Sequence, residues 1–381
     1  GNKTPQGNQD ANGIGDFYYA PPNSYLSLCS ANLPSVDVIP SEHFNTVLYT
    51  GDGTTSHAVT GVGFGSAPDF VWIKEREANG GHIAAHVLQD IVRGATNYLV
   101  SSATNAESTG VMLSLDSDGF TTNNSGATNE SGQPYVAWNW KAGGSAVSNT
   151  NGTITSQVSA NPSAGFSIVS YTGSGSAGTV GTGLSQRADL IITKGRSNSG
   201  NWVTWHKDLT GAFDSNGGYA YLNSTGAAAT TTVFYDGTGF TSSVFKWRGG
   251  NENVNQSSRT YLSYCFHSVE SYSKVGSYTG NGSTDGTFVH CGFRPAFVMV
   301  KRTNSTQDWT LFDNTRNPAN ATNLYLHPNS SAADGSGIGD GIDLVSNGFK
   351  MRHQANVTNN SGSPYIFLAF AESPFKHSNA R

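Results

Sequence analysis

The sequence predicts an all-β fold of three tandem β-sandwich repeats, jelly-roll-like, that follow an extended N-terminal arm. Two observations carry this prediction. The same series of landmarks occurs three times, in the same order, along the 381 residues. Only 12% of residues are charged while 46 are glycine, and the aromatic residues, 11% of the chain, gather in short strand-like clusters. Apolar clusters separated by Gly, Asn, Ser and Thr are typical of an all-β protein with many turns, and not of a disordered chain.

Each repeat contains the same four landmarks. It opens with a strand that ends in Tyr-Thr-Gly, at 44–51, 166–173 and 272–280. An apolar run ending in lysine comes next, at 70–74, 190–194 and 297–301. A Gly-Phe pair follows, and a Tyr-led hydrophobic strand closes the repeat at 135–140, 261–266 and 365–370. A unit of roughly 105 residues is too long for a solenoid repeat and long enough to be a small domain.

These landmarks divide the chain into six segments. We expect an extended arm at 1–42, repeat one at 43–144, a polar Gly/Ser/Thr linker at 145–164, repeat two at 165–270, repeat three at 271–376 and a tail at 377–381. The chain shows no signal peptide and begins with Gly1 rather than Met, so we expect a processed product or part of a longer polypeptide.

The closing strands predict the core. Alternate positions in them are large and apolar in all three copies, and alternate positions share one face of a strand. A face that stays bulky three times is expected to pack on the second sheet of its own sandwich. The lysine-ending run is apolar on both faces, which favours a central strand. The predicted core residues are Trp72, Trp138, Trp140, Tyr264, Phe266, Leu368 and Phe370.

A charged motif occurs in two of the repeats. Asp90 and Arg93 recur as Asp313 and Arg316, whereas repeat two has Asp208 with Gly211 in place of the arginine. An Asp-x-x-Arg pair closes a loop through a charge-assisted hydrogen bond. We interpret both as structural ion pairs and predict no catalytic residue, because a scaffold feature recurs and an active site need not.

Two patterns resemble metal sites. His82 and His86 have the i, i+4 spacing of zinc ligands, but that spacing requires a helix and the flanking signals are strands. The acidic stretches 116–118 and 334–343 resemble calcium loops without the spacing and terminal Glu of an EF-hand. We therefore expect no metal and no cofactor, with bound calcium kept as the alternative.

Composition excludes several functions. The net charge is −5 and the basic residues form no cluster, which argues against nucleic-acid binding. No apolar run approaches the ~20 residues of a membrane span, so we expect no membrane insertion. Three cysteines are too few, and odd in number, for a disulfide framework.

Repeat two is rich in aromatic residues that suit sugar binding. Flat apolar rings stack on sugar rings, so Trp202, Trp205, Tyr235 and Trp247 form a candidate ligand-binding site. The alternative is that these residues belong to the core of the sandwich.

The landmarks resemble a repeat module of virion structural proteins from marine tailed bacteriophages. The matching stretches are 68–74, 90–94, 118–120 and 135–143. Residues 16–22 resemble the junction that follows a lectin-like SPRY or concanavalin-type domain in such tail fibre and tail-associated proteins. Repeat two departs from the pattern, with Ala188 where proline is expected and without the Arg-Gly pair.

The resemblance implies a non-enzymatic structural protein of a tailed phage particle, in a tail fibre or other surface appendage that contributes to host recognition. Its partners would be other virion proteins, copies of itself and a host cell-surface glycan. By the same resemblance, the copies would form a trimer. Its location would be the virion surface, outside the cell. We expect the arm, with Phe17, Tyr18 and Tyr19, to bury its aromatic residues on a neighbouring subunit.

Two other functions remain open at this point. The rival function is that of a secreted bacterial multi-domain adhesin or carbohydrate-binding protein. A glycan-cleaving enzyme would need two carboxylates ~5 Å apart, or a wider pair, in a cleft. No Asp/Glu cluster of that kind stands out in the sequence.

Overall fold

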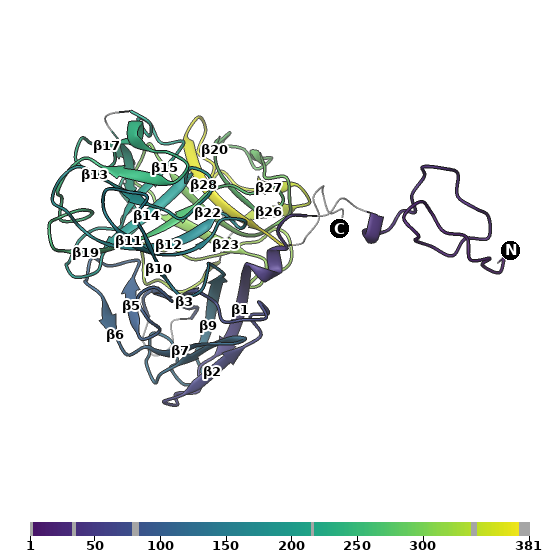
Figure 1. The fold of residues 1–381 in the computed structure, drawn as a ribbon, viewed down its shortest axis with the longest axis horizontal. Helices are drawn as coiled ribbons and strands as arrows, with labels where there is room; N and C mark the ends of the chain where they lie inside the picture. Colours follow the sequence, from purple (N-terminus) through teal and green to yellow (C-terminus); the bar gives the residue numbers. More distant parts are fainter. Residues whose placement is uncertain (1–2, 33–35, 78–83, 215–216, 337–340, 373–381) are drawn as a thin grey trace.

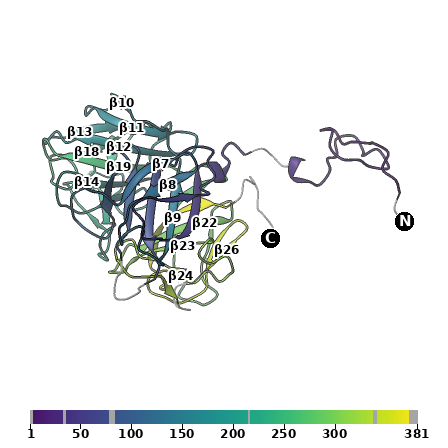
Figure 2. The ribbon, with the colours of Figure 1, turned by 90° about the horizontal axis from the view of Figure 1, so that it is seen from below.

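A computed structural model describes residues 3–32, 36–77, 84–214, 217–336 and 341–372. Nearly all the regular secondary structure of the described chain is antiparallel strand, so the predicted all-β sandwich fold is confirmed. The three repeats lie around a common centre, and the arm extends away from this body in both ribbon views (Figure 1, Figure 2).

Repeat one is a sandwich of a six-stranded and a three-stranded sheet. The larger sheet has the order β1-β9-β3-β4-β5-β6, and its strands are β1 (Phe44–Thr50), β9 (Pro134–Trp140), β3 (Phe70–Glu75), β4 (Val87–Asp90), β5 (Asn97–Val100) and β6 (Ser108–Thr109). The smaller sheet has the order β2-β8-β7, with β2 (His57–Thr60), β8 (Gly119–Thr122) and β7 (Met112–Asp116). The short 3₁₀ helices η1 (Ser30–Asn32) and η2 (Pro40–Glu42) precede the repeat.

Repeat two has the largest sheet, with eight strands. In order these are β10 (Val147–Asn149), β11 (Ser156–Asn161), β12 (Phe166–Thr172), β19 (Thr260–Phe266), β14 (Leu190–Gly195), β15 (Val203–His206), β16 (Gly218–Tyr221) and β17 (Ala229–Thr230). Its second sheet pairs β13 (Gly178–Gly181) with β18 (Val244–Trp247), next to the 3₁₀ helix η3 (Gly237–Gly239). The expected linker at 145–164 is thus wrong, because it forms β10 and β11 and extends this sheet.

The larger sheet of repeat three has four strands, fewer than the larger sheets of the other two repeats. In order these are β20 (Ser273–Thr279), β28 (Pro364–Ala371), β22 (Pro295–Arg302) and β23 (Trp309–Asp313). Its second sheet is β21 (Phe288–His290), β27 (Gly348–Met351) and β26 (Ile342–Val345), and β24 (Leu324–Tyr325) pairs with β25 (Gly335–Ser336).

The Tyr-led closing strand holds the same place in every repeat. β9, β19 and β28 each lie between the opening strand and the lysine-ending strand. The tyrosine at the start of each closing strand donates its hydroxyl hydrogen to a backbone carbonyl of the preceding loop. The pairs are Tyr135 with Gly126 at 2.9 Å, Tyr261 with Glu252 at 3.0 Å and Tyr365 with Asn356 at 2.8 Å. A buried phenol that keeps its hydrogen bond fixes the loop to the strand without an unsatisfied polar group.

The bulky face of the closing strand does not pack where the sequence predicts. All seven predicted core residues are buried, but Trp138, Tyr264 and Leu368 belong to a core shared by the three repeats. The second sheet of repeat one instead packs on the opposite face of β9, through Tyr135 and Ala137. The expectation that this bulky face lies inside its own sandwich is therefore wrong, because each sandwich also has a neighbour to cover its outer face.

Aromatic rings fill the shared core. The ring of Phe70 stacks on Tyr264 of repeat two with centroids 4.3 Å apart, and Phe44 stacks on Phe370 of repeat three at 4.9 Å. Residues of all three repeats leave a cavity of only 10 Å³ among them. A single water needs about that much room, so this centre is a packed core and holds no ligand.

The arm has its own small polar core. The buried carboxylate of Asp10 accepts hydrogen bonds from the backbone of Ile14 and from the hydroxyl of Ser27, at 3.0 and 2.5 Å. These bonds hold the pKa of Asp10 well below its usual value. Large apolar side chains of the arm remain exposed to solvent, with Tyr25 69% and Leu28 102% exposed.

Candidate functional site

The aromatic residues of repeat two do not form a ligand site. Trp202, Trp205, Tyr235 and Trp247 are each 0% exposed. The indole of Trp202 donates to the carbonyl of Val100 in repeat one at 2.8 Å, and that of Trp205 donates to Ala212 at 2.9 Å. Sugar stacking needs an accessible ring face, so the expected ligand-binding role is wrong and these residues are core.

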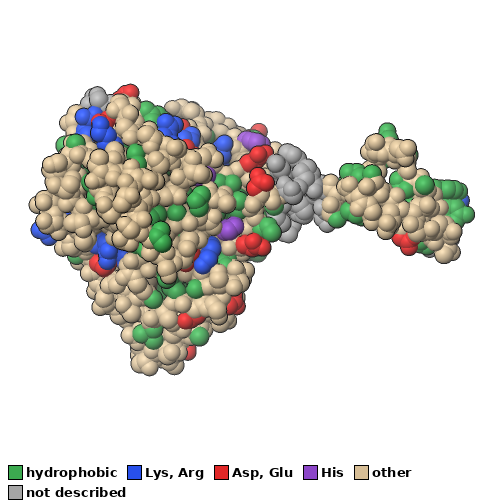
Figure 3. Space-filling model, in the orientation of Figure 1, with side chains coloured by type: hydrophobic (Ala, Val, Ile, Leu, Met, Phe, Trp, Pro, Cys, Tyr) green, Lys and Arg blue, Asp and Glu red, His purple; other side chains and the backbone are tan. Residues whose placement is uncertain are grey.

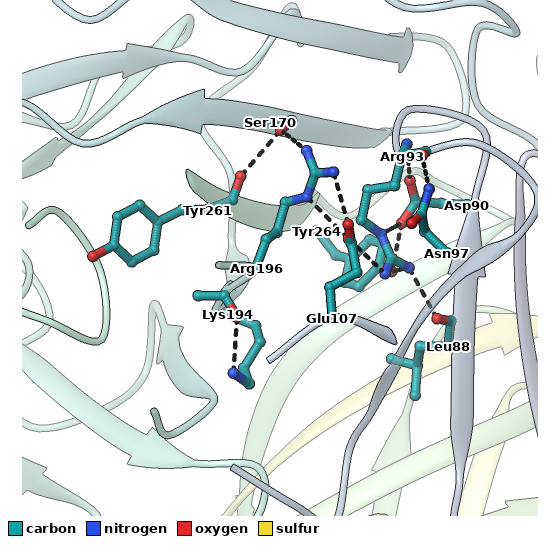
Figure 4. A network of polar contacts seen from close by, with 11 residues as sticks. Leu88, Asp90, Arg93, Asn97, Glu107, Ser170, Lys194, Arg196, Tyr261 and Tyr264 are labelled. Atoms are coloured by element: carbon teal, nitrogen blue, oxygen red, sulfur yellow. Dashed lines mark hydrogen bonds and ion pairs between the residues drawn. The ribbon is translucent and has the colours of Figure 1, made fainter. Parts of the chain in front are cut away.

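The most elaborate polar site lies at the junction of repeats one and two (Figure 4). Arg93 Nε lies 2.6 Å from Asp90, and neither side chain is exposed to solvent. Glu107 contacts Arg93 at 3.3 Å and, from its other oxygen, Arg196 of repeat two at 3.0 Å. The phenol of Tyr264 completes the group by donating to Asp90 at 2.9 Å. Charges from two repeats thus neutralise one another, with Asp90 and Arg93 buried and Glu107 and Arg196 partly exposed.

The electrostatics of this junction favour a fixed arrangement. Burial lowers the pKa of Arg93, but the carboxylates of Asp90 and Glu107 outweigh burial and raise that pKa above its usual value. Burial, reinforced by the charge of Asp90, raises the pKa of Tyr264 well above its usual value. The arginine therefore stays charged and the phenol keeps its proton near neutral pH, which preserves the hydrogen bond from Tyr264 to Asp90.

The junction of repeats three and one contains an equivalent set. Arg316 Nε lies 2.5 Å from Asp313, again with both side chains buried. Asp334 lies between Arg316 and Arg76 of repeat one, at 2.7 and 2.9 Å. The indole of Trp138 donates to Asp313 at 3.1 Å, in the place that the phenol of Tyr264 takes at the first junction.

The junction of repeats two and three has no equivalent of the Asp–Arg pair among the described residues. The strand registers pair Phe70 with Asp90, Leu190 with His206 and Phe297 with Asp313, so His206 is the counterpart of the two aspartates. The sequence assignment of Asp208 to this position, with Gly211 for the arginine, is wrong by two residues. Burial lowers the pKa of His206 to about 4, and its Nε2 faces the carbonyl of Phe367 at 3.4 Å.

One backbone contact nevertheless repeats at all three junctions. The amides of Glu107, Ala228 and Asp334 donate to the carbonyls of Arg196, Thr303 and Arg76, at 2.8, 2.8 and 2.7 Å. Repeat one therefore contacts repeat two, two contacts three, and three contacts one through the same edges. The contacts close a ring with approximate threefold symmetry inside one chain.

Sequence reasoning found the two Asp–Arg pairs but missed their partners Glu107, Arg196, Asp334 and Arg76. A signal was present for the arginines, because Arg76 and Arg196 both follow the repeated lysine by two residues. In repeat three the residue two positions after the lysine is Thr303. Its partner across the junction of repeats two and three is Ala228, where the other junctions have an acid. The acids lie in loops of unequal length, so only the structure aligns them.

The predicted metal patterns have other roles in the described part of the chain. His82 lies outside the described residues, while His86 Nδ1 accepts a 2.9 Å hydrogen bond from the indole of Trp72. Asp118 accepts from the backbone amides of Gly61 and Gly63 at 3.1 and 2.9 Å. Within 3–32, 36–77, 84–214, 217–336 and 341–372, no three His, Cys, Asp or Glu side chains gather as ligands would.

The visible surface is polar but sparsely charged. In the space-filling view, uncharged polar groups and backbone cover most of the body, with charged side chains scattered among them (Figure 3). Apolar side chains gather on the arm, where Tyr19, Tyr25 and Leu28 are exposed. Over the same described ranges, no helix is long and apolar enough to cross a bilayer.

Comparison with known proteins gives a family but no function. A family model described as a domain of unknown function, DUF7483, matches residues 39–374. This match covers nearly all of the three repeats as one unit and includes only the last four residues of the arm. No curated protein matches the chain.

Proposed function

The chain belongs to the DUF7483 family, and we propose that it is a non-enzymatic structural protein of a tailed phage particle, in a tail fibre or other surface appendage. The observation that carries the proposal is the closed ring of three sandwiches. Ion pairs across two of the junctions and a shared aromatic core join the repeats, so the body is a rigid mount for its outer loops. Recognition loops are commonly presented from rigid scaffolds of this kind.

The sequence resemblance supports the same function. The stretches 68–74 and 135–143, which resemble the phage module, form the central strands β3 and β9 of repeat one and the loops beside them. In this proposal the polar outer loops contribute to contact with the host surface. The exposed arm attaches the body to other virion proteins and to copies of the same chain. The location is accordingly the surface of the virion.

Immunogold electron microscopy tests the proposal. Antibodies raised against the purified chain would be applied to phage particles released from a lysed culture, with antibody pre-absorbed on the chain as the control. We expect label on a tail fibre or other appendage, removed by pre-absorption. Label on the bacterial surface or in the medium, with none on particles, would contradict the proposal and favour the secreted adhesin.

A further inference from the structure

The outer edges of the three large sheets differ in one respect. The opening strands β1, β12 and β20 hold equivalent places, since Phe44, Phe166 and Ser273 pair with the equivalent closing-strand residues Trp140, Phe266 and Phe370. β12 is covered on its outer side by β11, whereas β1 and β20 are the outermost strands of their sheets in the described chain. An uncovered strand edge presents unpaired backbone groups to a further strand.

Repeat two shows how such an edge is filled. The segment just before β12 folds back as β11, which pairs antiparallel with it along Ser156–Asn161. The same segment also contacts the second sheet, because Ile154 bridges to Val180 of β13. One extended segment therefore closes the side of the sandwich by contacting both sheets.

Repeat three has a groove in the equivalent place. Two hollows of 370 and 530 Å³ adjoin along β20 and share Lys274 and His290. One side is the edge of β20, and the other is β21, whose Phe288 is 45% exposed. Lys207 of repeat two lies at the end of this groove. A smaller hollow of 150 Å³ lies beside β1, the third equivalent edge.

The open part of the β20 edge is at Ser277. Ser273 already pairs with Val269, and the amide of Val275 donates to the hydroxyl of Ser268 at 3.0 Å, so both residues turn these backbone groups away from β28 and both are occupied. Backbone groups two residues apart in a strand point the same way, which directs the amide and carbonyl of the exposed Ser277 outward. An added strand would find its hydrogen-bonding partners there, as extended peptides do at open sheet edges.

We propose that this groove, between β20 and β21, accepts the N-terminal arm of a second copy of the chain as an added strand. The arm comes just before β1 in the chain, as β11 comes just before β12. Whereas β11 folds back to pair with β12, the arm extends away from the body of its own chain (Figure 1). Leu26 and Leu28, 47% and 102% exposed, alternate with Ser27. In a strand the two leucines would share one face, and that face would meet the exposed ring of Phe288.

The charges that line the groove are balanced. Lys274 and Lys207 lie there with Glu270 and Asp208, and Lys207 is paired with Asp208 at 2.9 Å, so backbone pairing and apolar contact would supply the affinity. Binding exchanges the bonds between Ser27 and Asp10 for pairing with β20. This proposal rests on the part of the proposed function in which copies of the chain contact one another. It is tested on the pure chain in solution, separately from any labelling of particles.

Light scattering after size exclusion measures the assembly. We expect the full chain to exceed the 40.1 kDa monomer mass as its concentration rises. Ser277→Pro removes the outward amide at an edge position where proline is tolerated, and Ser277→Ala is its control because it keeps that amide. Ser277→Pro should raise the dissociation constant about tenfold or more, and the alanine variant should leave it unchanged. Leu26→Ser/Leu28→Ser should weaken assembly from the arm side.

Two results would overturn the proposal. One is a full chain that stays at the monomer mass over the whole concentration range. The other is assembly that is equally strong in Ser277→Pro, with its fold verified by circular dichroism. Should the proline variant fail to fold, Phe288→Ser replaces an exposed side chain on the groove and must weaken assembly for the proposal to stand.

Discussion

The phenol of Tyr264 donates a 2.9 Å hydrogen bond to Asp90, which lies 174 residues earlier and in the neighbouring repeat. The indole of Trp138 does the same to Asp313, 175 residues later, at 3.1 Å. Two chemically different donors, at equivalent positions of their closing strands, thus bond to equivalent aspartates. At the third junction the donor position is Leu368 and the acid is replaced by His206, so donor and acceptor are absent together.

Replacing Tyr264 by Phe removes only the hydroxyl at this contact. Asp90 keeps its ion pair with Arg93 but loses the hydrogen bond from Tyr264. Because the site is buried, this loss should lower the free energy of unfolding by about 1–3 kcal/mol. Leu368→Met, at the equivalent position without a polar partner, should cost less than about 1.5 kcal/mol. Urea unfolding measures both, and equal losses would mean that the hydrogen bond stabilises nothing.

Glu107→Gln tests the charges that join repeats one and two. The change is nearly isosteric but leaves Arg93 and Arg196 without a shared carboxylate, and Arg93 is buried. We expect a loss of about 1–3 kcal/mol, typical of a broken hydrogen bond to a charged group. Glu130→Gln, an exposed acid of the same repeat, should stay within about 0.5 kcal/mol of the original chain. An unchanged Glu107→Gln variant would count against a stabilising junction.

Trp138→Ala should be among the most damaging single changes. The side chain is 0% exposed and packs on His86 and on Phe297 of repeat three. Removing a large buried aromatic costs about 3–5 kcal/mol. Because the ring lies between repeats, the loss should appear in the unfolding of the whole body. A loss below about 1 kcal/mol in denaturant unfolding would place Trp138 outside a packed core.

The three repeated lysines predict a rise of stability at alkaline pH. Burial lowers the pKa of Lys74, Lys194 and Lys301 to about 8 in each repeat. An unfolded lysine titrates near ~10.4, so the unfolded chain binds more protons above about pH 8. The free energy of unfolding should therefore rise from about pH 7.5 to about pH 9.5, below the range where unfolded tyrosines ionise. Lys194→Met should make this rise smaller, and a flat profile in the original chain would refute the assignment.

The sequence was informative where the repeat acts locally. The strand-forming landmarks, the closing tyrosines, the buried tryptophans of repeat one and the Asp–Arg pairs all follow from patterns that a strand or a turn imposes on nearby residues. The 145–164 segment was misread as a linker because its strands are short and lack aromatic residues, and β11 is held by pairing with β12. Local pattern carries no record of such pairing.

The shared core was the larger omission. A bulky strand face looks the same in a sequence whether it packs on its own second sheet or on a neighbouring repeat. Only the contact of Phe70 with Tyr264, and of Phe44 with Phe370, shows which of the two applies. The misplacement of repeat two's site residues follows from this, since Trp202 donates its indole N–H to repeat one and is unavailable to a ligand.

Scanning calorimetry of the whole chain tests most directly whether the three repeats form one closed body. Because one core and three equivalent junctions join the repeats, we expect a single transition whose calorimetric and van't Hoff enthalpies agree. Trp138→Ala should shift that transition to lower temperature without splitting it. Separate transitions for the repeats, with only one of them moved by Trp138→Ala, would contradict the closed ring.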